Sequence, residues 1–193
     1  MAFATIDVTK GITGTIPVAN GGTGVASGTT GQFLKFTGST AIGTGEAGGG
    51  KILQVINSVN GTIDSTTSSS LANTSTTASI TPSATSSKIL VIAKVNGIYC
   101  GHESTSLDLA INRDSTQIVD FGGTVGYNTE EGTNDSGQTG DGVTFLDTPN
   151  SSSSLTYTIR FASSDNSNQI QINNHIRGSI RPKSSITLME VGA

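Results

Sequence analysis

The stretch KILVIAKVNGIY, residues 88–99, decides the fold. Positions 89, 91, 93 and 95 are apolar and fall on one face of an extended chain, whereas Leu90 and Ile92 fall on the opposite face. Alternation of this kind predicts a β-strand, and apolar residues on both faces predict that it is covered on both sides. We therefore expect residues 88–99 to form a central strand.

Shorter runs of the same kind lie on either side of this strand. Residues 106–112 and 117–121 flank Arg113-Asp114-Ser115, which is typical of a hairpin turn. Further strands are expected at 51–56, 76–81 (ending at Pro82), 143–147, 155–161, 170–172 (edge-like) and 186–191. About eight or nine regularly spaced strands without a helical pattern predict an all-β fold, a jelly-roll-like antiparallel β-sandwich.

The composition supports an all-β protein with a thin core. Of the 193 residues, 33% are hydrophobic and 12% are charged, against the roughly 25% charged residues of an average domain. The net charge of -4 is too small to be typical of a disordered chain. A thin core favours stabilisation by association with other chains.

A glycine-rich segment precedes the strands. Residues 14–24 read GTIPVANGGTG, which can neither propagate a helix nor pack as an independent strand. Short strands are expected over 1–10 and 31–36, and GTGEAGGG at residues 43–50 indicates a hinge. The sequence therefore predicts an extended segment over residues 1–50 and a sandwich head over residues 51–193.

The string GTIPVANGGTG resembles the PVANGGTG element of bacteriophage tail fibres and other virion appendages. Residues 184–191 (SSITLMEV) and, more loosely, 79–91 (SITPSATSSKILV) resemble parts of the small β head domains of marine phages. This resemblance implies a homotrimer that is anchored to another virion protein by its N-terminal segment. The residues implied in anchoring and trimerisation are Gly14, Ile16, Pro17, Val18, Asn20, Gly21, Gly22 and Gly24.

The polar stretch 122–142 predicts a long loop, and we expect a receptor site there. Tyr127 is placed to stack on a sugar of a host-surface glycan, although an exposed tyrosine without a ligand explains it equally well. The candidate contact residues are Tyr127, Glu130, Asn134, Asp135 and Asp141.

Catalytic and cofactor motifs are incomplete, so we expect no enzyme, cofactor or metal. Residues 45–51 match only the GxxxxGK part of a phosphate-binding loop, because Ile52 follows the lysine where Ser or Thr is needed. His102 and His175 lie far apart without ligands at metal-binding spacing. The carboxylates considered for glycan cleavage fall mostly at turns or on outward strand positions: Asp108, Asp114, Asp120, Glu130, Glu131 and Asp141.

Two further classes of partner are disfavoured. The pI of about 5.0 argues against nucleic acid, which needs clustered Lys and Arg. No apolar run approaches the roughly 20 residues of a membrane helix.

The sequence thus predicts a structural virion component, a short phage tail fibre or appendage for host adsorption. The alternatives are a capsid head fibre or decoration protein, and a free carbohydrate-binding lectin.

Overall fold

The structure is a computed structural model that describes residues 32–38, 41–45, 50–102, 105–125, 136–174 and 181–192. The chain divides into two units, Met1–Gly49 and Gly50–Ala193. The strand expected over residues 1–10 and the glycine element at 14–24 lie outside the described residues.

In the first unit, β1 (Phe33–Gly38) and β2 (Ala41–Gly45) form an antiparallel hairpin. The expected strand near 31–36 is confirmed as β1. The expected hinge overlaps β2, because residues 43–45 pair with β1 although their glycines show no strand pattern. Phe33, Leu34 and Phe36 are exposed.

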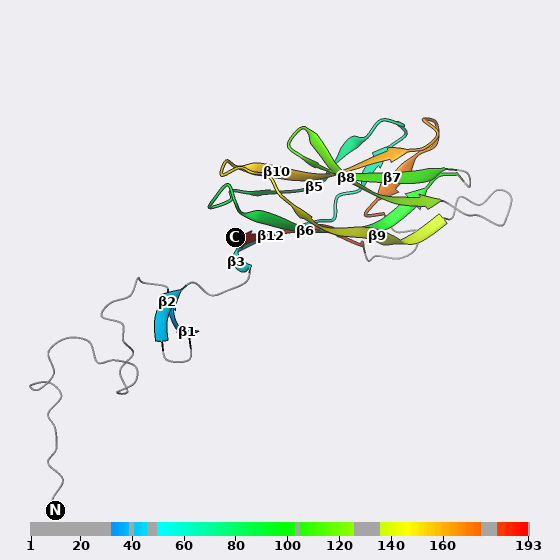
Figure 1. Cartoon of the computed structure of the whole chain (residues 1–193). Coiled ribbons are helices and arrows are strands. Elements are labelled where there is room, and N and C mark those ends of the chain that lie inside the picture. The colour runs from blue at the N-terminus through cyan, green and yellow to red at the C-terminus, as the bar shows by residue number, and fades with distance from the viewer. Residues whose placement is uncertain are drawn as a thin grey trace, which may run out of the picture. The chain divides into compact units, whose positions relative to one another are not determined.

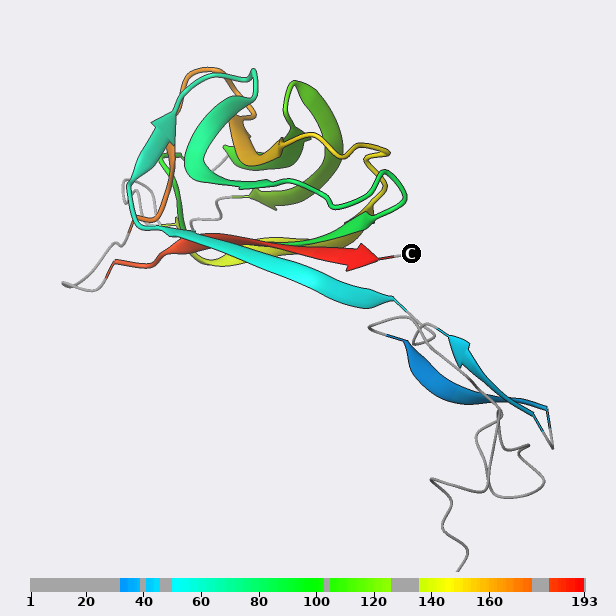
Figure 2. The ribbon, with the colours of Figure 1, turned by 90° about the vertical axis from the view of Figure 1, so that its left-hand side faces the viewer.

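The second unit is a sandwich of two antiparallel sheets (Figures 1 and 2). One sheet has the order β5-β10-β7-β8. The other has the order β3-β12-β6-β11-β4, and β9 pairs with the remaining edge of β6. The strands are β3 (Lys51–Asn60), β4 (Asp64–Thr66), β5 (Ala72–Ile80), β6 (Lys88–Cys100), β7 (Ser106–Arg113), β8 (Thr116–Val125), β9 (Ser136–Asp147), β10 (Leu155–Ser163), β11 (Ile170–Ile172) and β12 (Ser184–Gly192).

The strand pairs are nested, as in a jelly roll. β3 with β4 acts as one interrupted first strand, and β11 with β12 acts as one interrupted last strand, because both β12 and β11 pair with β6. The first strand pairs with the last, β5 with β10, β6 with β9, and β7 with β8. The predicted all-β, jelly-roll-like sandwich is confirmed.

The last strand is interrupted where β6 changes its neighbour from β12 to β11. Gly97 lies there with φ of 62°, and a Cβ atom would come within 2.3 Å of the Asn174 carbonyl oxygen. Asn173 fills the gap: its Oδ1 accepts from the Ser184 backbone N–H at 2.8 Å, and its Nδ2 donates to the Thr62 carbonyl at 2.8 Å. β11 lies between β6 and β4, so the expectation of an edge-like strand is wrong. With only three residues, β11 has too short a sequence pattern to indicate that strands lie on both sides of it.

The core lies between the sheets and includes Val91, Tyr157, Ile159 and Leu188, all fully buried. β6 is central, as predicted, with β9 on one edge and β12 on the other. The prediction that both its faces are covered is wrong for the part of the chain that the structure describes. Ile92 on the outer face remains 36% exposed.

The loop expected over 122–142 is shorter than predicted. Residues 122–125 continue β8, and residues 136–142 belong to β9. Gly122 and Gly123 have φ of 84° and 112°, and the β7–β8 register shifts beside them. Backbone pairing therefore extends β8 along β7 and β9 along β6, although these residues show no apolar alternation in the sequence.

Candidate functional site

Most of the predicted site residues lie outside the described part of the chain. These are Gly14, Ile16, Pro17, Val18, Asn20, Gly21, Gly22 and Gly24 of the anchoring set, and Tyr127, Glu130, Asn134 and Asp135 of the receptor set. Asp141 lies in β9, paired with Val95, and is half-buried. Its Oδ1 accepts the Gly142 N–H at 2.7 Å. The expectation that Asp141 lies in a loop is wrong, because β9 begins at Ser136. Its role as a receptor contact stays a prediction.

The outer face of the sheet β3-β12-β6-β9 carries an apolar row that crosses all four strands. Val55, Met189, Leu90 and Leu146 are successive cross-strand neighbours in the registers of these pairs. Val55 is 53% exposed and Leu146 50% exposed. We call the surface around this row the apolar face. Its apolar residues are Ile52, Val55, Val59, Leu90, Ile92, Leu146, Met189 and Val191.

The opposite outer face, on β5-β10-β7-β8, is polar. Thr158 pairs with Thr77 on one side and with Asn112 on the other. Hydrogen bonds cross the strands between the hydroxyls of Thr77 and Thr158 at 3.1 Å, and between Ser79 and Thr156 at 2.8 Å. A sheet with one solvated face normally shows polar residues there. The two outer faces of the sandwich therefore differ in kind, and the apolar face is typical of a protein contact surface.

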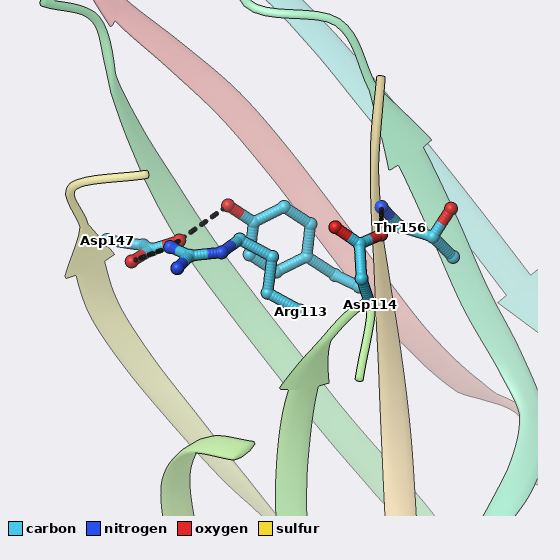
Figure 3. Close-up of polar contacts among 5 residues, drawn as sticks. Arg113, Asp114, Asp147 and Thr156 are labelled. Atoms are coloured by element: carbon cyan, nitrogen blue, oxygen red, sulfur yellow. Dashed lines mark hydrogen bonds and ion pairs between the residues drawn. The ribbon is translucent and has the colours of Figure 1, made fainter. Parts of the chain in front are cut away.

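One carboxylate, that of Asp147, joins the two sheets. Asp147, at the end of β9, accepts two hydrogen bonds from Arg113 Nη1, at 2.8 Å and 2.7 Å, and one from the Tyr157 hydroxyl at 2.7 Å (Figure 3). Burial and the bond to Asp147 raise the pKa of Tyr157 well above its usual value. Burial lowers the pKa of Arg113, but the bonds and charge of Asp147 outweigh this effect and raise it. These groups are engaged in holding β9 to β7 and β10.

A second carboxylate joins two stretches that are distant in sequence. Glu190 of β12 is fully buried, and its Oε1 accepts from the Ser83 N–H at 2.7 Å and the Ser83 hydroxyl at 2.6 Å. Its Oε2 accepts from Gln54 Nε2 at 2.6 Å. Burial alone raises the pKa of a carboxyl group, but the bonds from Ser83, Gln54 and Ser87 outweigh it and lower the pKa of Glu190 to about 2. The hydrogen bonds of Glu190 thus join residues 79–91 to residues 184–191.

This pKa predicts a loss of stability in acid. The pKa of Glu190 lies below the ordinary value of 4.5, so the unfolded chain binds the proton more tightly. The contribution of Glu190 to stability is present above pH 4.5 and is lost as the pH falls toward 2. Urea unfolding between pH 7 and pH 2 should show this loss, and the loss should be smaller in Glu190→Gln. Equal acid sensitivity of both proteins would contradict the assignment.

A third carboxylate organises the turn after β10. Asp165 accepts hydrogen bonds from the Asn168 N–H at 2.8 Å, the Asn168 amide at 2.6 Å and the Thr105 hydroxyl at 2.8 Å. The pKa of Asp165 is held well below its usual range, mainly by the two hydrogen bonds from Asn168. Like Asp147 and Glu190, this carboxylate has a structural role.

Two other carboxylates meet at a hollow beside β8. Asp108 and Asp120 line it together with Phe121, Gly122 and Gly123, and its volume is about 510 Å³. Asp114 instead lies in the β7–β8 turn, where its Oδ1 accepts the Thr156 N–H at 2.9 Å (Figure 3). In the ranges that the structure describes, no three His, Cys, Asp or Glu side chains are grouped as metal ligands. Those ranges also contain no helix long and apolar enough to span a membrane.

Comparisons with known proteins identify no family. No protein-family model matches the chain, and no curated protein sequence matches it. Among solved structures, the chain is similar to the one described as the crystal structure of infectious bursal disease virus VP2 subviral particle. The identity is 12% and the TM-score 0.36, over 83% of this chain and 44% of that chain. The chain spans less than half of that viral chain, and no functional conclusion follows from a likeness at this level.

Proposed function

We propose that the protein is a structural, non-enzymatic component of a bacteriophage particle, a short tail fibre or similar appendage. In this proposal three chains associate, their glycine-rich N-terminal segments attach to another virion protein, and the sandwich heads meet the host surface. The particle is the proposed location of the protein.

The observation that carries the proposal is the apolar face of an otherwise complete sandwich. The core between the sheets is filled, yet Ile52, Val55 and Leu146 are at least half exposed on one outer face. Such a surface favours a part that works in an assembly over a free monomer. The resemblance of residues 14–24 to the PVANGGTG element supports a phage appendage as that assembly.

Three hydrogen-bonded carboxylates also support a structural role. Asp147, Glu190 and Asp165 each accept several hydrogen bonds that tie strands or turns together. A catalytic carboxylate would instead need to reach a substrate. In this proposal, the hollow lined by Asp108 and Asp120 is a candidate surface for a host glycan.

Gold-labelled antibodies against the full chain, applied to phage particles from the lysate that contains it, test the location. We expect labels at the tail, and pre-absorption of the antibody with purified protein should remove them. Labels over the capsid shell would favour a head fibre or decoration protein. Unlabelled particles with the chain free in the supernatant would contradict the proposal and favour the lectin.

A further inference from the structure

We infer that the hollow beside β8 binds a sugar unit of a glycan, and that this sugar carries no acidic group. The inference rests on the proposed function and deepens it, because it assigns the hollow as the site and names the class of sugar. The hollow has a volume of about 510 Å³, within the roughly 300–1,000 Å³ that is usual for small-molecule sites. A basic protein partner would need a wider contact, about 800 Å² on each side.

A glycine bulge in β8 opens the hollow. The register of β7 and β8 shifts between Leu107 and Asp108, where Gly123 is the extra residue of β8. Gly122 and Gly123 have φ of 84° and 112°, and a Cβ atom on Gly123 would meet no atom beyond its chain neighbours within 4 Å. Bulges often lie beside functional sites, where they redirect side chains. The sheet therefore presents open backbone beside the Asp108 carboxylate.

The hollow offers hydrogen-bond acceptors that the protein leaves unused. Asp108 and Asp120 both line it and are exposed on the outer face of the sheet. Asp108 pairs with Gly122, so Asp120 is its diagonal neighbour on β8, about 7–8 Å away between Cα atoms. Among the described residues no donor bonds to the Asp108 carboxylate, and Asp120 accepts only from Gln117 Nε2, at 2.5 Å. Both carboxylates are therefore available to the hydroxyl groups of a ligand.

The nearest arginine of the sheet does not neutralise these carboxylates. Arg160 of β10 lies in the same cross-strand row as Asp120, with Ala110 between them. Its Nη2 donates to the Leu71 carbonyl, which ties β10 to the wall of the hollow. In the described part of the chain neither Asp108 nor Asp120 takes part in an ion pair. The hollow therefore keeps its negative charge.

This charge determines which sugars the hollow accepts. Asp141 of the opposite sheet adds a third carboxylate, since its Oδ2 lies 3.2 Å from the position of a Cβ atom on Gly122. Sugar hydroxyls make strong charge-assisted hydrogen bonds to carboxylates, whereas the carboxylate of a uronic acid would be repelled. Leu71 and Ala162 add apolar lining for the C–H groups of a sugar ring.

The position of the hollow in the sandwich fits a contact with an outside partner. The chain enters the sandwich at Lys51, which pairs with Gly192 at the end of the sheet that also carries Asp147. The hydrogen bonds from Arg113 to Asp147 place Arg113 at this same end (Figure 3). Asp108 precedes Arg113 by five residues in β7, about 17 Å toward the opposite end. The N-terminal segment therefore joins one end of the sandwich, and the hollow lies at the other.

An array of immobilised polymers, probed with the full chain, tests this inference. The array carries neutral polymers of glucose, galactose, mannose, rhamnose and N-acetylglucosamine, the acidic polymers polygalacturonate and alginate, and polylysine. We expect the chain to bind at least one neutral polymer and neither acidic polymer. Asp108→Asn should weaken this binding about tenfold or more, because it removes a charged acceptor. The matched control Asp114→Asn removes the same charge from the exposed β7–β8 turn at the opposite end, and it should bind as wild type does.

Each other outcome would overturn the inference. Equal binding by Asp108→Asn and wild type would place the contact elsewhere on the sandwich. Binding to the acidic polymers would contradict the role of the carboxylates, and binding to polylysine alone would indicate a basic protein partner. A chain that binds no neutral polymer would show that the hollow takes no sugar. The gold-label experiment is independent of this array, so the proposed location on the particle can stand if the sugar site fails.

Discussion

Replacing Glu190 with alanine is expected to lower the free energy of unfolding by about 2–4 kcal/mol, a large share of the ~5–15 kcal/mol that stabilises a typical domain. The carboxylate accepts two hydrogen bonds from Ser83 and one from Gln54 while fully buried. Alanine removes the acceptor for all three and leaves a cavity beside the β5–β6 connection. Urea denaturation at pH 7, followed by circular dichroism, measures the loss.

The variant Glu190→Gln separates the loss of hydrogen bonding from the loss of charge. Glutamine has nearly the same shape and retains one acceptor oxygen for Ser83, so its stability should lie between wild type and Glu190→Ala. Asp108→Ala, at an exposed carboxylate, should change the free energy of unfolding by no more than about 0.5 kcal/mol. If Glu190→Ala were as stable as Asp108→Ala, the bonds to Ser83 and Gln54 would not matter for the fold.

Replacing Asp147 with alanine is expected to cost about 2–4 kcal/mol of unfolding free energy, because it leaves two partners without their acceptor. The Tyr157 side chain is fully buried, so water cannot easily replace the carboxylate at its hydroxyl. Arg113 is 22% exposed and recovers part of its solvation. Thermal unfolding should show a lower midpoint than in wild type.

A second variant identifies the source of this loss. Tyr157→Phe removes only the hydroxyl and leaves the Arg113–Asp147 pair in place, so it should destabilise by about 1 kcal/mol. A double-mutant cycle of Asp147→Ala and Tyr157→Phe should show coupling, since the two residues share one hydrogen bond. Additive effects would mean that this bond does not contribute to joining the sheets.

The sandwich was predictable because its core strands alternate cleanly. Leu155, Tyr157, Ile159 and Phe161 face inward in β10, as their spacing predicts, and Asp114 makes the turn between β7 and β8. The pattern could not reveal β2, the extension of β9 to Ser136, or the interior position of β11. Those segments are strands because of their backbone partners, and their own side chains carry little signal.

The candidate site was less predictable, for a different physical reason. The sequence shows that Leu90 and Ile92 are apolar and lie on the face opposite the core residues. The simplest prediction from this pattern is that other parts of the same chain cover that face. Their alignment with Val55, Met189 and Leu146 depends on the order and register of four strands. The hydrogen bonds of Glu190 likewise depend on a connection more than a hundred residues away.

The native mass of the full chain in solution tests the central claim, that this protein is built to associate in threes. Light scattering at micromolar concentration should give three times the 19.6 kDa of one chain. Leu90→Glu should reduce that mass, because it places a charge in the middle of the apolar face. A wild-type mass of one chain across the concentration range would contradict the account.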